Sequence, residues 1–184
     1  MKSLTKWLGV RIACPLVFLA ASTNPASSHS RSSETAERSS TCAGAEYRQF
    51  DFWVGDWDVF EAGNPSLVAR AQVDRILDGC VLREDYQRTT GLRGQSLSIY
   101  DASRKEWHQS WVTNRGELLV IEGNLVDGRM VLSGSDLTAD GHERKVRGTW
   151  APMNEGVRET AVESFDGGKT WKPWFDLMFR PHRN

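Results

Sequence analysis

Short apolar runs that end at glycine-containing turns constrain the fold more than any other feature of this sequence. Leu125 to Leu132, LVDGRMVL, is the clearest example, because Asp127-Gly128 joins two apolar runs and suits a hairpin turn with positive φ. Similar turn signals recur along the chain at Asp78-Gly79, Asp140-Gly141, Glu155-Gly156 and Gly167-Gly168. The spacing predicts eight to ten strands between Gln49 and Pro181 and no long helix. We therefore expect an all-β antiparallel up-and-down barrel, with a two-sheet sandwich as the alternative.

Length and charge limit the number of domains and the kind of partner. A chain of 184 residues is long enough for one domain with a sizeable core and too short for two comfortable ones. Its 23 basic and 24 acidic side chains give a net charge of -1, which gives no electrostatic reason to expect nucleic-acid or acidic-membrane binding.

The N-terminal region has the pattern of an export signal followed by a tail. Basic residues precede a short apolar run, Ile12 to Ser22, which predicts a cleaved signal peptide over residues 1–22 and no membrane span after cleavage. Residues 23–43 are rich in Ser, Thr and Ala and predict a flexible tail, so that the barrel domain occupies residues 44–184. We expect a secreted or periplasmic protein.

Two cysteines remain after signal cleavage, because Cys14 leaves with the signal. An even pair in an oxidising compartment predicts a disulfide between Cys42 and Cys80, with two free buried thiols as the alternative. Such a bond would tie the tail to the domain and contribute about 3 to 4 kcal/mol in the loop-entropy model.

The stretch FDFWVGDWDVF, Phe50 to Phe60, combines bulky aromatic and acidic residues. With the period of two that a strand imposes, Trp53, Gly55, Trp57 and Val59 share one face and Asp56 and Asp58 the other. We expect a strand with an aromatic inner face that fills the barrel base and an acidic outer face that keeps it soluble.

These residues carry a resemblance. Gly55-Asp56-Trp57 on the first strand is similar to the Gly-x-Trp signature of lipocalin and calycin barrels, and FDFWVGDWDV with ILDGCVLRE and YDASRKEWHQSW resembles a family of uncharacterised exported bacterial proteins. The resemblance covers nearly the whole mature domain and implies a calycin-like barrel, but it brings no activity. It also implies that Trp57 closes the barrel base and that a basic residue near the last strand, here Arg180, packs across that ring.

Alternation along the other strands places several polar residues inside the barrel. In CVLREDYQR, the residues Glu84 and Tyr86 share the inner face with Cys80 and Leu82. A buried carboxylate needs a cation, a ligand or a proton, and we expect Arg75 as the partner of Glu84. The predicted ligand-binding residues are Trp53, Arg75, Glu84, Tyr86, Trp107, Gln109, Trp111, Arg144 and Trp150, with the tryptophans as apolar walls.

One turn has a recognisable motif of its own. SFDGGKTW, Ser164 to Trp171, matches the Asp-box pattern Ser-x-Asp-x-Gly-x-Thr-Trp, in which the aspartate caps a hairpin turn and the tryptophan packs beneath it. We interpret Asp166 as a structural turn residue and infer no sialidase activity. A single copy favours one hairpin and not a propeller, which needs repeated blades.

Enzyme chemistry has little support in the sequence. We find no G-x-S-x-G elbow, no Walker-type phosphate loop and no histidine pair at metal-ligand spacing, so no catalytic or metal-binding residue and no cofactor is expected. His108 and His142 are interpreted as surface residues. Haem ligation by His108 or His182 is kept as an alternative with no second supporting feature.

The sequence therefore predicts an exported, monomeric or weakly oligomeric barrel that binds a small, largely apolar molecule in its interior. Two alternatives remain open. The first is an enzyme that uses the same interior with Glu84 as general acid or base. The second is a structural or interaction module of the cell envelope whose barrel is filled by its own side chains, in which the inward polar groups only fix the barrel register.

Overall fold

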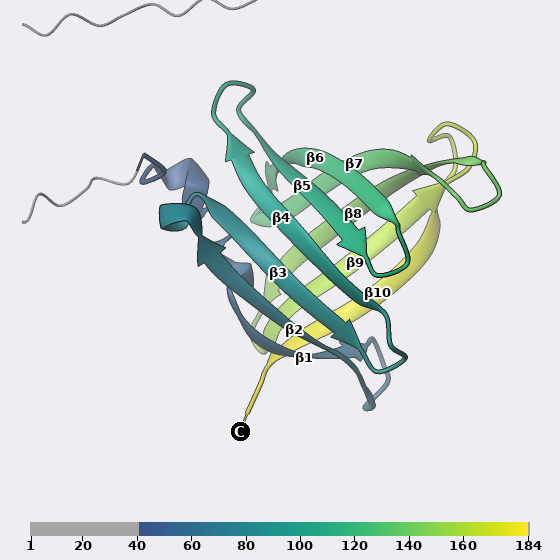
Figure 1. Cartoon of the computed structure of the whole chain (residues 1–184), viewed down its shortest axis with the longest axis horizontal. Coiled ribbons are helices and arrows are strands. Elements are labelled where there is room, and N and C mark those ends of the chain that lie inside the picture. Colours follow the sequence, from purple (N-terminus) through teal and green to yellow (C-terminus); the bar gives the residue numbers. More distant parts are fainter. Residues whose placement is uncertain (1–40, 184) are drawn as a thin grey trace, which may run out of the picture. The chain divides into compact units, whose positions relative to one another are not determined.

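Ten antiparallel strands form a closed up-and-down barrel in the computed structural model, which describes residues 41–183 (Figure 1). The strands are β1 (Gly55–Glu61), β2 (Leu67–Ile76), β3 (Val81–Arg88), β4 (Arg93–Asp101), β5 (Glu106–Thr113), β6 (Leu118–Val126), β7 (Arg129–Leu137), β8 (Glu143–Met153), β9 (Gly156–Ser164) and β10 (Lys172–Pro181). Within the described residues, three short 3₁₀ helices accompany them: η1 (Ala45–Arg48), η2 (Asp51–Trp53) and η3 (Leu77–Gly79). The predicted fold class is confirmed. The predicted signal peptide and most of the predicted tail lie outside the described residues.

Each strand pairs with its neighbours in sequence, and the first pairs with the last. Between β1 and β10 the register runs from Trp57 opposite Pro181 to Glu61 opposite Leu177. Figure 1 shows β10, in yellow, beside β1, in dark blue. Because this last pairing leaves no edge strand in the sheet, the barrel replaces the two-sheet sandwich that the sequence left as an alternative.

The hairpin between β6 and β7 explains how the turn signals work. Asp127 has a φ of 49° and Gly128 a φ of 74°, so both central residues of this two-residue loop are left-handed. Two such residues give the turn the twist of its flanking strands, and Asp-Gly is a sequence that tolerates this conformation. The predicted turn is confirmed.

One end of the barrel is plugged by the residues that precede β1. Phe50, which is fully buried, stacks on Trp53 of η2 at 5.0 Å between ring centroids. Its ring also meets Trp107 and Trp150 edge-on at 5.7 and 5.5 Å. We call this the plugged end, where β1 begins and β10 ends, and the opposite end the far end. The prediction that Trp53 lies on the first strand is wrong, because the backbone turns through η2 and the strand begins at Gly55.

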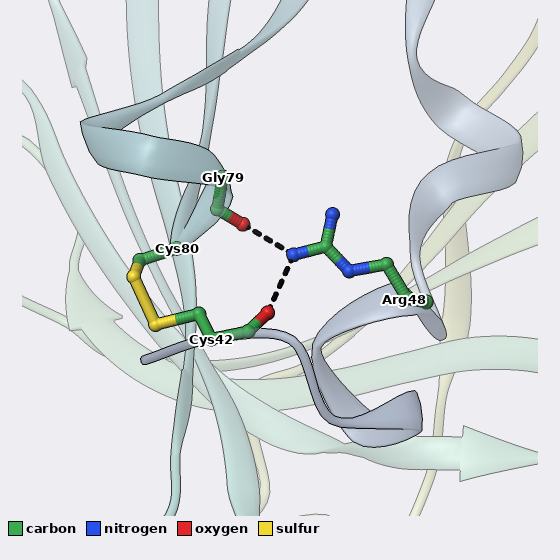
Figure 2. The surroundings of a disulfide bond; sticks show 4 residues. All are labelled: Cys42, Arg48, Gly79 and Cys80. Atoms are coloured by element: carbon green, nitrogen blue, oxygen red, sulfur yellow. Dashed lines mark hydrogen bonds between the residues drawn. A yellow bond between two sulfur atoms is a disulfide. The ribbon is translucent and has the colours of Figure 1, made fainter. Parts of the chain in front are cut away.

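A disulfide attaches the plug to the barrel wall. Cys42 and Cys80 are bonded, which confirms the predicted pair, and their Cα atoms are 5.1 Å apart. The Arg48 guanidinium donates to the carbonyl oxygens of Cys42 at 2.8 Å and Gly79 at 2.7 Å (Figure 2). The start of the described chain is therefore held against the turn between β2 and β3 by one covalent and two hydrogen bonds.

Within residues 41–183, no helix combines the length and the apolar character needed to cross a membrane.

Candidate functional site

A layer of buried polar side chains crosses the barrel interior above the aromatic plug. Glu84 of β3 is 6% exposed, and Ser96 opposite it on β4 is 1% exposed. The Ser96 hydroxyl donates to Oε2 of Glu84 at 3.1 Å. Two positions after Ser96 on β4, the hydroxyl of Ser98 accepts a hydrogen bond from Nε2 of Gln109, which lies opposite it on β5, at 2.9 Å. Strand alternation places all four side chains inside, as it predicts for Glu84 and Gln109.

A second interior carboxyl group, Glu159 of β9, escaped the sequence analysis. Glu159 alternates with Val157 and Ala161, which are 1% and 2% exposed, so it shares their inward face. It lies opposite Trp150 of β8 and Leu177 of β10. The sequence signal was present, because apolar residues two positions away on each side, Val157 and Ala161, mark this face.

The two carboxyl groups affect each other. Burial raises the pKa of Glu84 to about 8, with the Ser96 hydrogen bond opposing the rise and the charge of Asp85 adding to it. Burial also raises the pKa of Glu159 well above its usual value, and the negative charge of Glu84 raises it further, while the indole N–H of Trp150 opposes this. Across residues 41–183, neither group forms an ion pair. At neutral pH the interior therefore favours the protonated carboxyl forms.

Tyr86 borders the same layer on the side of the far end. Its side chain is 7% exposed, and its ring meets the half-buried Trp111 edge-on with 5.8 Å between centroids. Burial raises the pKa of its hydroxyl to about 12; Arg88 opposes the rise, and Glu159 and Glu84 add to it. No hydrogen bond to this hydroxyl is formed by the residues that the structure describes. Tyr86 and Trp111 thus supply an aromatic border and a free polar atom.

The predicted ion pair between Glu84 and Arg75 is wrong. Arg75 forms an ion pair with Asp51 of η2 instead. Alternation places Arg75 beside Val73 on the inner face, but its position near the plugged end of β2 brings it to the 3₁₀ helix. The partner could not be found from strand alternation, because it belongs to the plug.

Arg144, another predicted ligand-binding residue, already has anionic partners near the far end. Its guanidinium donates to Asp136 of β7 at 2.6 Å and lies 3.4 Å from Glu163 of β9. Its Cζ is 4.3 Å from the ring centroid of Trp174. Arg144 is therefore neutralised by two carboxylates and gives no charge to Glu84.

The four predicted wall tryptophans divide into two groups. Trp53, Trp107 and Trp150 are 1 to 2% exposed and belong to the packed cluster around Phe50, although Trp150 also borders Glu159. Trp111 is the one of the four that keeps partial exposure. The role of any of these residues in ligand binding stays a prediction.

The two residues expected to close the barrel base are not in contact as the resemblance implies. Trp57 is 6% exposed and donates its indole N–H to the carbonyl oxygen of Trp53 at 3.0 Å, so it lies against the plug. Arg180 is exposed and lies over the ring of Phe60 on the outer face, at 5.1 Å. The expectation for Arg180 is wrong because it alternates with the inward Phe179 and so faces outward.

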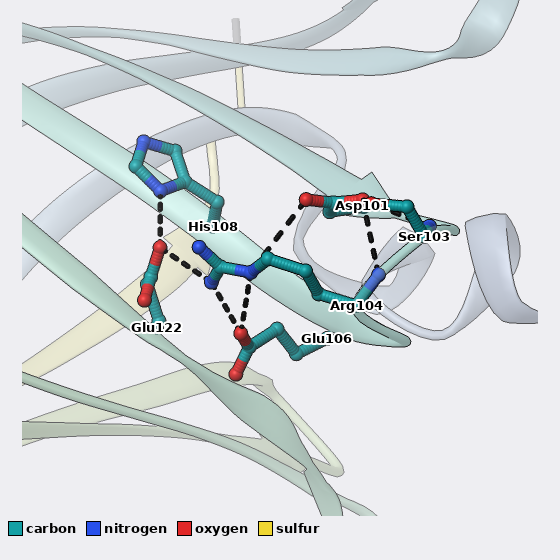
Figure 3. Close-up of polar contacts among 6 residues, drawn as sticks. All are labelled: Asp101, Ser103, Arg104, Glu106, His108 and Glu122. Atoms are coloured by element: carbon teal, nitrogen blue, oxygen red, sulfur yellow. Dashed lines mark hydrogen bonds and ion pairs between the residues drawn. The ribbon is translucent and has the colours of Figure 1, made fainter.

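The histidines considered for haem ligation lie outside the barrel. His108 meets Glu122 at 2.9 Å within a surface cluster on the outer face of β5 and β6, where Arg104 also contacts Glu122 and Glu106 (Figure 3). His182 follows β10 and its Nδ1 is 3.1 Å from Asp58. Both rings therefore face carboxylates and not the interior. In the part of the chain that is described, no group of three or more metal-binding side chains comes together.

The Asp-box hairpin between β9 and β10 has the structural role that its sequence predicts. Asp166 Oδ1 accepts hydrogen bonds from the backbone N–H groups of Lys169 and Thr170, both at 2.9 Å, and Oδ2 accepts from the Thr170 hydroxyl at 2.6 Å. These bonds hold the pKa of Asp166 far below its usual range. Trp171 donates to the carbonyl oxygen of Gly168 at 3.1 Å and so closes the loop.

The surface also carries a hollow of about 370 Å³ near the far ends of β3, β4 and β5. Most of its lining side chains, such as Asp85, Gln95 and Val112, belong to the outward-facing set. Gln95 Nε2 donates to Asp85 at 2.5 Å across its floor. The hollow opens on the outer wall, and Tyr86, which borders the interior layer, is also among its lining residues.

Comparison with protein-family models and with curated proteins finds no match to this chain. The fold and the interior together define its class: a closed, ten-stranded, antiparallel β-barrel, consistent with a calycin-like fold, with an acidic interior and one plugged end.

Proposed function

We propose that this protein binds a small, largely apolar molecule inside the half of the barrel nearer the far end. The observation that carries the proposal is the state of Glu84, a carboxyl group that is 6% exposed and has the Ser96 hydroxyl as its hydrogen-bond partner. Burying such a group without a counter-charge costs several kcal/mol, and an apolar residue of similar volume would fill a purely structural barrel at lower cost. A polar group kept at this cost is typical of a binding site.

The surroundings of Glu84 match a ligand with an apolar body. Trp111 pairs with Leu119 across β5 and β6, and Leu177 of β10 also faces inward; both leucines are 9% exposed. Tyr86 completes this border. Because the plug fills the other end, a ligand would reach these side chains through the far end.

A fluorescence titration tests the proposal. A neutral apolar probe such as N-phenyl-1-naphthylamine is titrated into the mature protein, and tryptophan quenching is measured. We expect saturable quenching that Trp111→Ala abolishes. Trp171→Ala is the matched control, because it also removes one tryptophan but lies in the Asp-box hairpin, and it should keep the response. Absence of saturable quenching in the parent protein would contradict the proposal and favour a filled, structural barrel.

An enzyme that uses the same interior is the second candidate, favoured by one observation. The pKa of Glu84, raised to about 8, lies in the range in which a carboxyl group donates and accepts protons near neutral pH. Glu84→Gln should then abolish turnover of a bound substrate and leave its binding unchanged, whereas a binding protein has no turnover to lose.

We also propose that the protein is exported. The bond between Cys42 and Cys80 supports this, because structural disulfides persist in oxidising compartments. Expression of the full chain in a bacterial host and recovery of a shortened, oxidised product from the periplasm or medium would support export. Retention of the intact, reduced chain in the cytoplasm would contradict it.

A further inference from the structure

We propose that the interior ligand carries a positively charged amine, which Glu84, Glu159 and Tyr86 hold inside the barrel. This inference rests on the proposed function, since it assigns a chemical class to the molecule bound there. Figure 1 shows the two strands that supply the carboxyl groups, β3 and β9, separated by β2, β1 and β10 along the shorter way round the wall.

The two carboxyl groups lie within electrostatic reach of each other across the interior. Glu84 faces inward between Leu82 and Tyr86, and Glu159 faces inward between Val157 and Ala161. The negative charge of Glu84 raises the pKa of Glu159, and the charges of both carboxylates raise the pKa of the Tyr86 hydroxyl. We place the amine between these two strands, on the face that carries both carboxyl groups.

The arginines near these groups are already paired with other carboxylates. Arg75 is paired with Asp51, and Arg144 with Asp136 and Glu163. Arg88, which acts on Tyr86 from the end of β3, is 2.7 Å from Glu61. The described interior thus contains two acidic groups without a cation of its own, and an external cation would supply the missing charge.

Tyr86 and Trp111 provide the second, independent reason for an amine. Tyr86 is 7% exposed as a residue, and its hydroxyl forms no hydrogen bond within residues 41–183. A protonated primary amine has three N–H donors, which match the oxygen acceptors of one ionised carboxyl group, of the second carboxyl group and of this hydroxyl. The Trp111 ring, held edge-on by Tyr86, offers a π-system near the same place for a cation–π contact.

Binding should change the protonation of the site. The groups that act on it are Ser96 and Asp85 on Glu84, Trp150 on Glu159, and Arg88 and Glu61 on Tyr86. Without ligand, burial keeps the carboxyl groups protonated at neutral pH. A cation favours their ionised forms, so an amine that is already protonated should release a proton to solvent when it binds, whereas a neutral ligand should release none.

Isothermal titration calorimetry with a matched pair of probes tests the inference. The probes are 1-naphthylmethylamine and the neutral 1-naphthylmethanol, titrated at pH 7.5 in buffers of different ionisation enthalpy. We expect the amine to bind at least about tenfold more tightly than the alcohol, a difference of about 1.4 kcal/mol, with close to one proton released per site. Glu84→Gln and Glu159→Gln should each bring the two affinities close together and still bind the alcohol. Tyr86→Phe should weaken the amine by a smaller factor.

Glu155→Gln is the control, since it removes a carboxylate from the exposed turn between β8 and β9 and should keep the preference. Equal affinities without proton release would overturn the amine inference and leave the proposed function standing. An amine preference that survives both interior substitutions would also overturn it, because the charge would then be recognised elsewhere. Binding of neither probe would count against both the inference and the proposed function.

Discussion

Ser96 on β4 donates its hydroxyl hydrogen to Glu84 on β3 across 3.1 Å in the barrel interior. Ser96 is 1% exposed and Glu84 6%, so this bond forms where water has little access. One neutral donor does not replace the hydration of a carboxylate, and burial consequently dominates the pKa of Glu84.

The first prediction is that Glu84→Gln stabilises the protein at alkaline pH. The pKa of Glu84 is raised from 4.5 to about 8. The contribution of protonated Glu84 to the free energy of unfolding is therefore fully present below pH 4.5 and is lost as the pH rises to about 8. Glutamine has a similar shape and no charge. We expect the two melting temperatures to be similar near pH 4.5 and the variant to melt at least about 5 °C higher at pH 9. Glu155→Gln, in the exposed turn between β8 and β9, is the control. A difference between Glu84→Gln and the parent protein that stays flat from pH 5 to 9 would contradict the prediction.

The second prediction concerns the bond between Cys42 and Cys80. It closes a loop with a sequence separation of 38 residues, for which the loop-entropy model gives a stabilisation of about 4 kcal/mol. The double variant Cys42→Ala/Cys80→Ala should unfold at correspondingly lower urea concentration. Reductant should shift the parent protein toward the variant and leave the variant unchanged. Equal unfolding curves of the parent with and without reductant would show that the bond contributes nothing.

The third prediction is that Phe50 is the residue on which the plug depends most. Its ring is fully buried and contacts the rings of Phe52, Trp53, Trp107 and Trp150. Phe50→Ala should lower the free energy of unfolding by about 3 to 5 kcal/mol, because it leaves a cavity among these rings. Phe165→Ala removes the same side chain from a position that is 53% exposed and should change it by less than about 0.5 kcal/mol. Similar losses in both variants, measured by denaturant unfolding, would refute the assignment.

The fourth prediction is that Asp166 stabilises its hairpin only while it is ionised. Its lowered pKa means that its contribution is present above the ordinary value of 3.8 and is lost as the pH falls through the folded-state value. Asp166→Ala should lower the melting temperature at pH 7 and speed amide hydrogen exchange between β9 and β10, with a smaller effect on the temperature in strong acid. Asp166→Asn keeps one acceptor oxygen and should lie in between. Unchanged exchange in this hairpin would disprove the role.

The strands and the hairpins could be predicted from sequence because their causes are local. The turn at Asp127-Gly128 depends on the backbone preferences of two adjacent residues. The Asp-box from Ser164 to Trp171 likewise contains both the donors and the acceptors of its hydrogen bonds. Alternation along β3 likewise places Glu84 inside from its immediate neighbours alone. Such features need no knowledge of which strands meet.

The partners of charged residues could not be predicted in the same way. Arg75 pairs with Asp51 because the 3₁₀ helix η2 turns back under the barrel. The alternation of side chains predicts that the first strand continues through this helix, and it therefore gives no sign of the pair. The charge of Glu84 raises the pKa of Glu159, although Glu159 lies more than 70 positions later in the sequence. The two residues come near each other only because the barrel closes. Arg180 is a different case. Its alternation with Phe179 predicts an outward side chain from the sequence alone, whereas the resemblance to lipocalin barrels implies a side chain that packs on Trp57.

The pairing of β1 with β10 determines how early in its synthesis the barrel can close. Trp57 lies opposite Pro181, so the first strand finds its second neighbour only after all ten strands have been synthesised. Until then, an N-terminal fragment presents two unpaired sheet edges, and contacts this distant in sequence form slowly. A chain that is exported unfolded would meet this requirement naturally, because the last strand arrives in the same compartment before the barrel has to close.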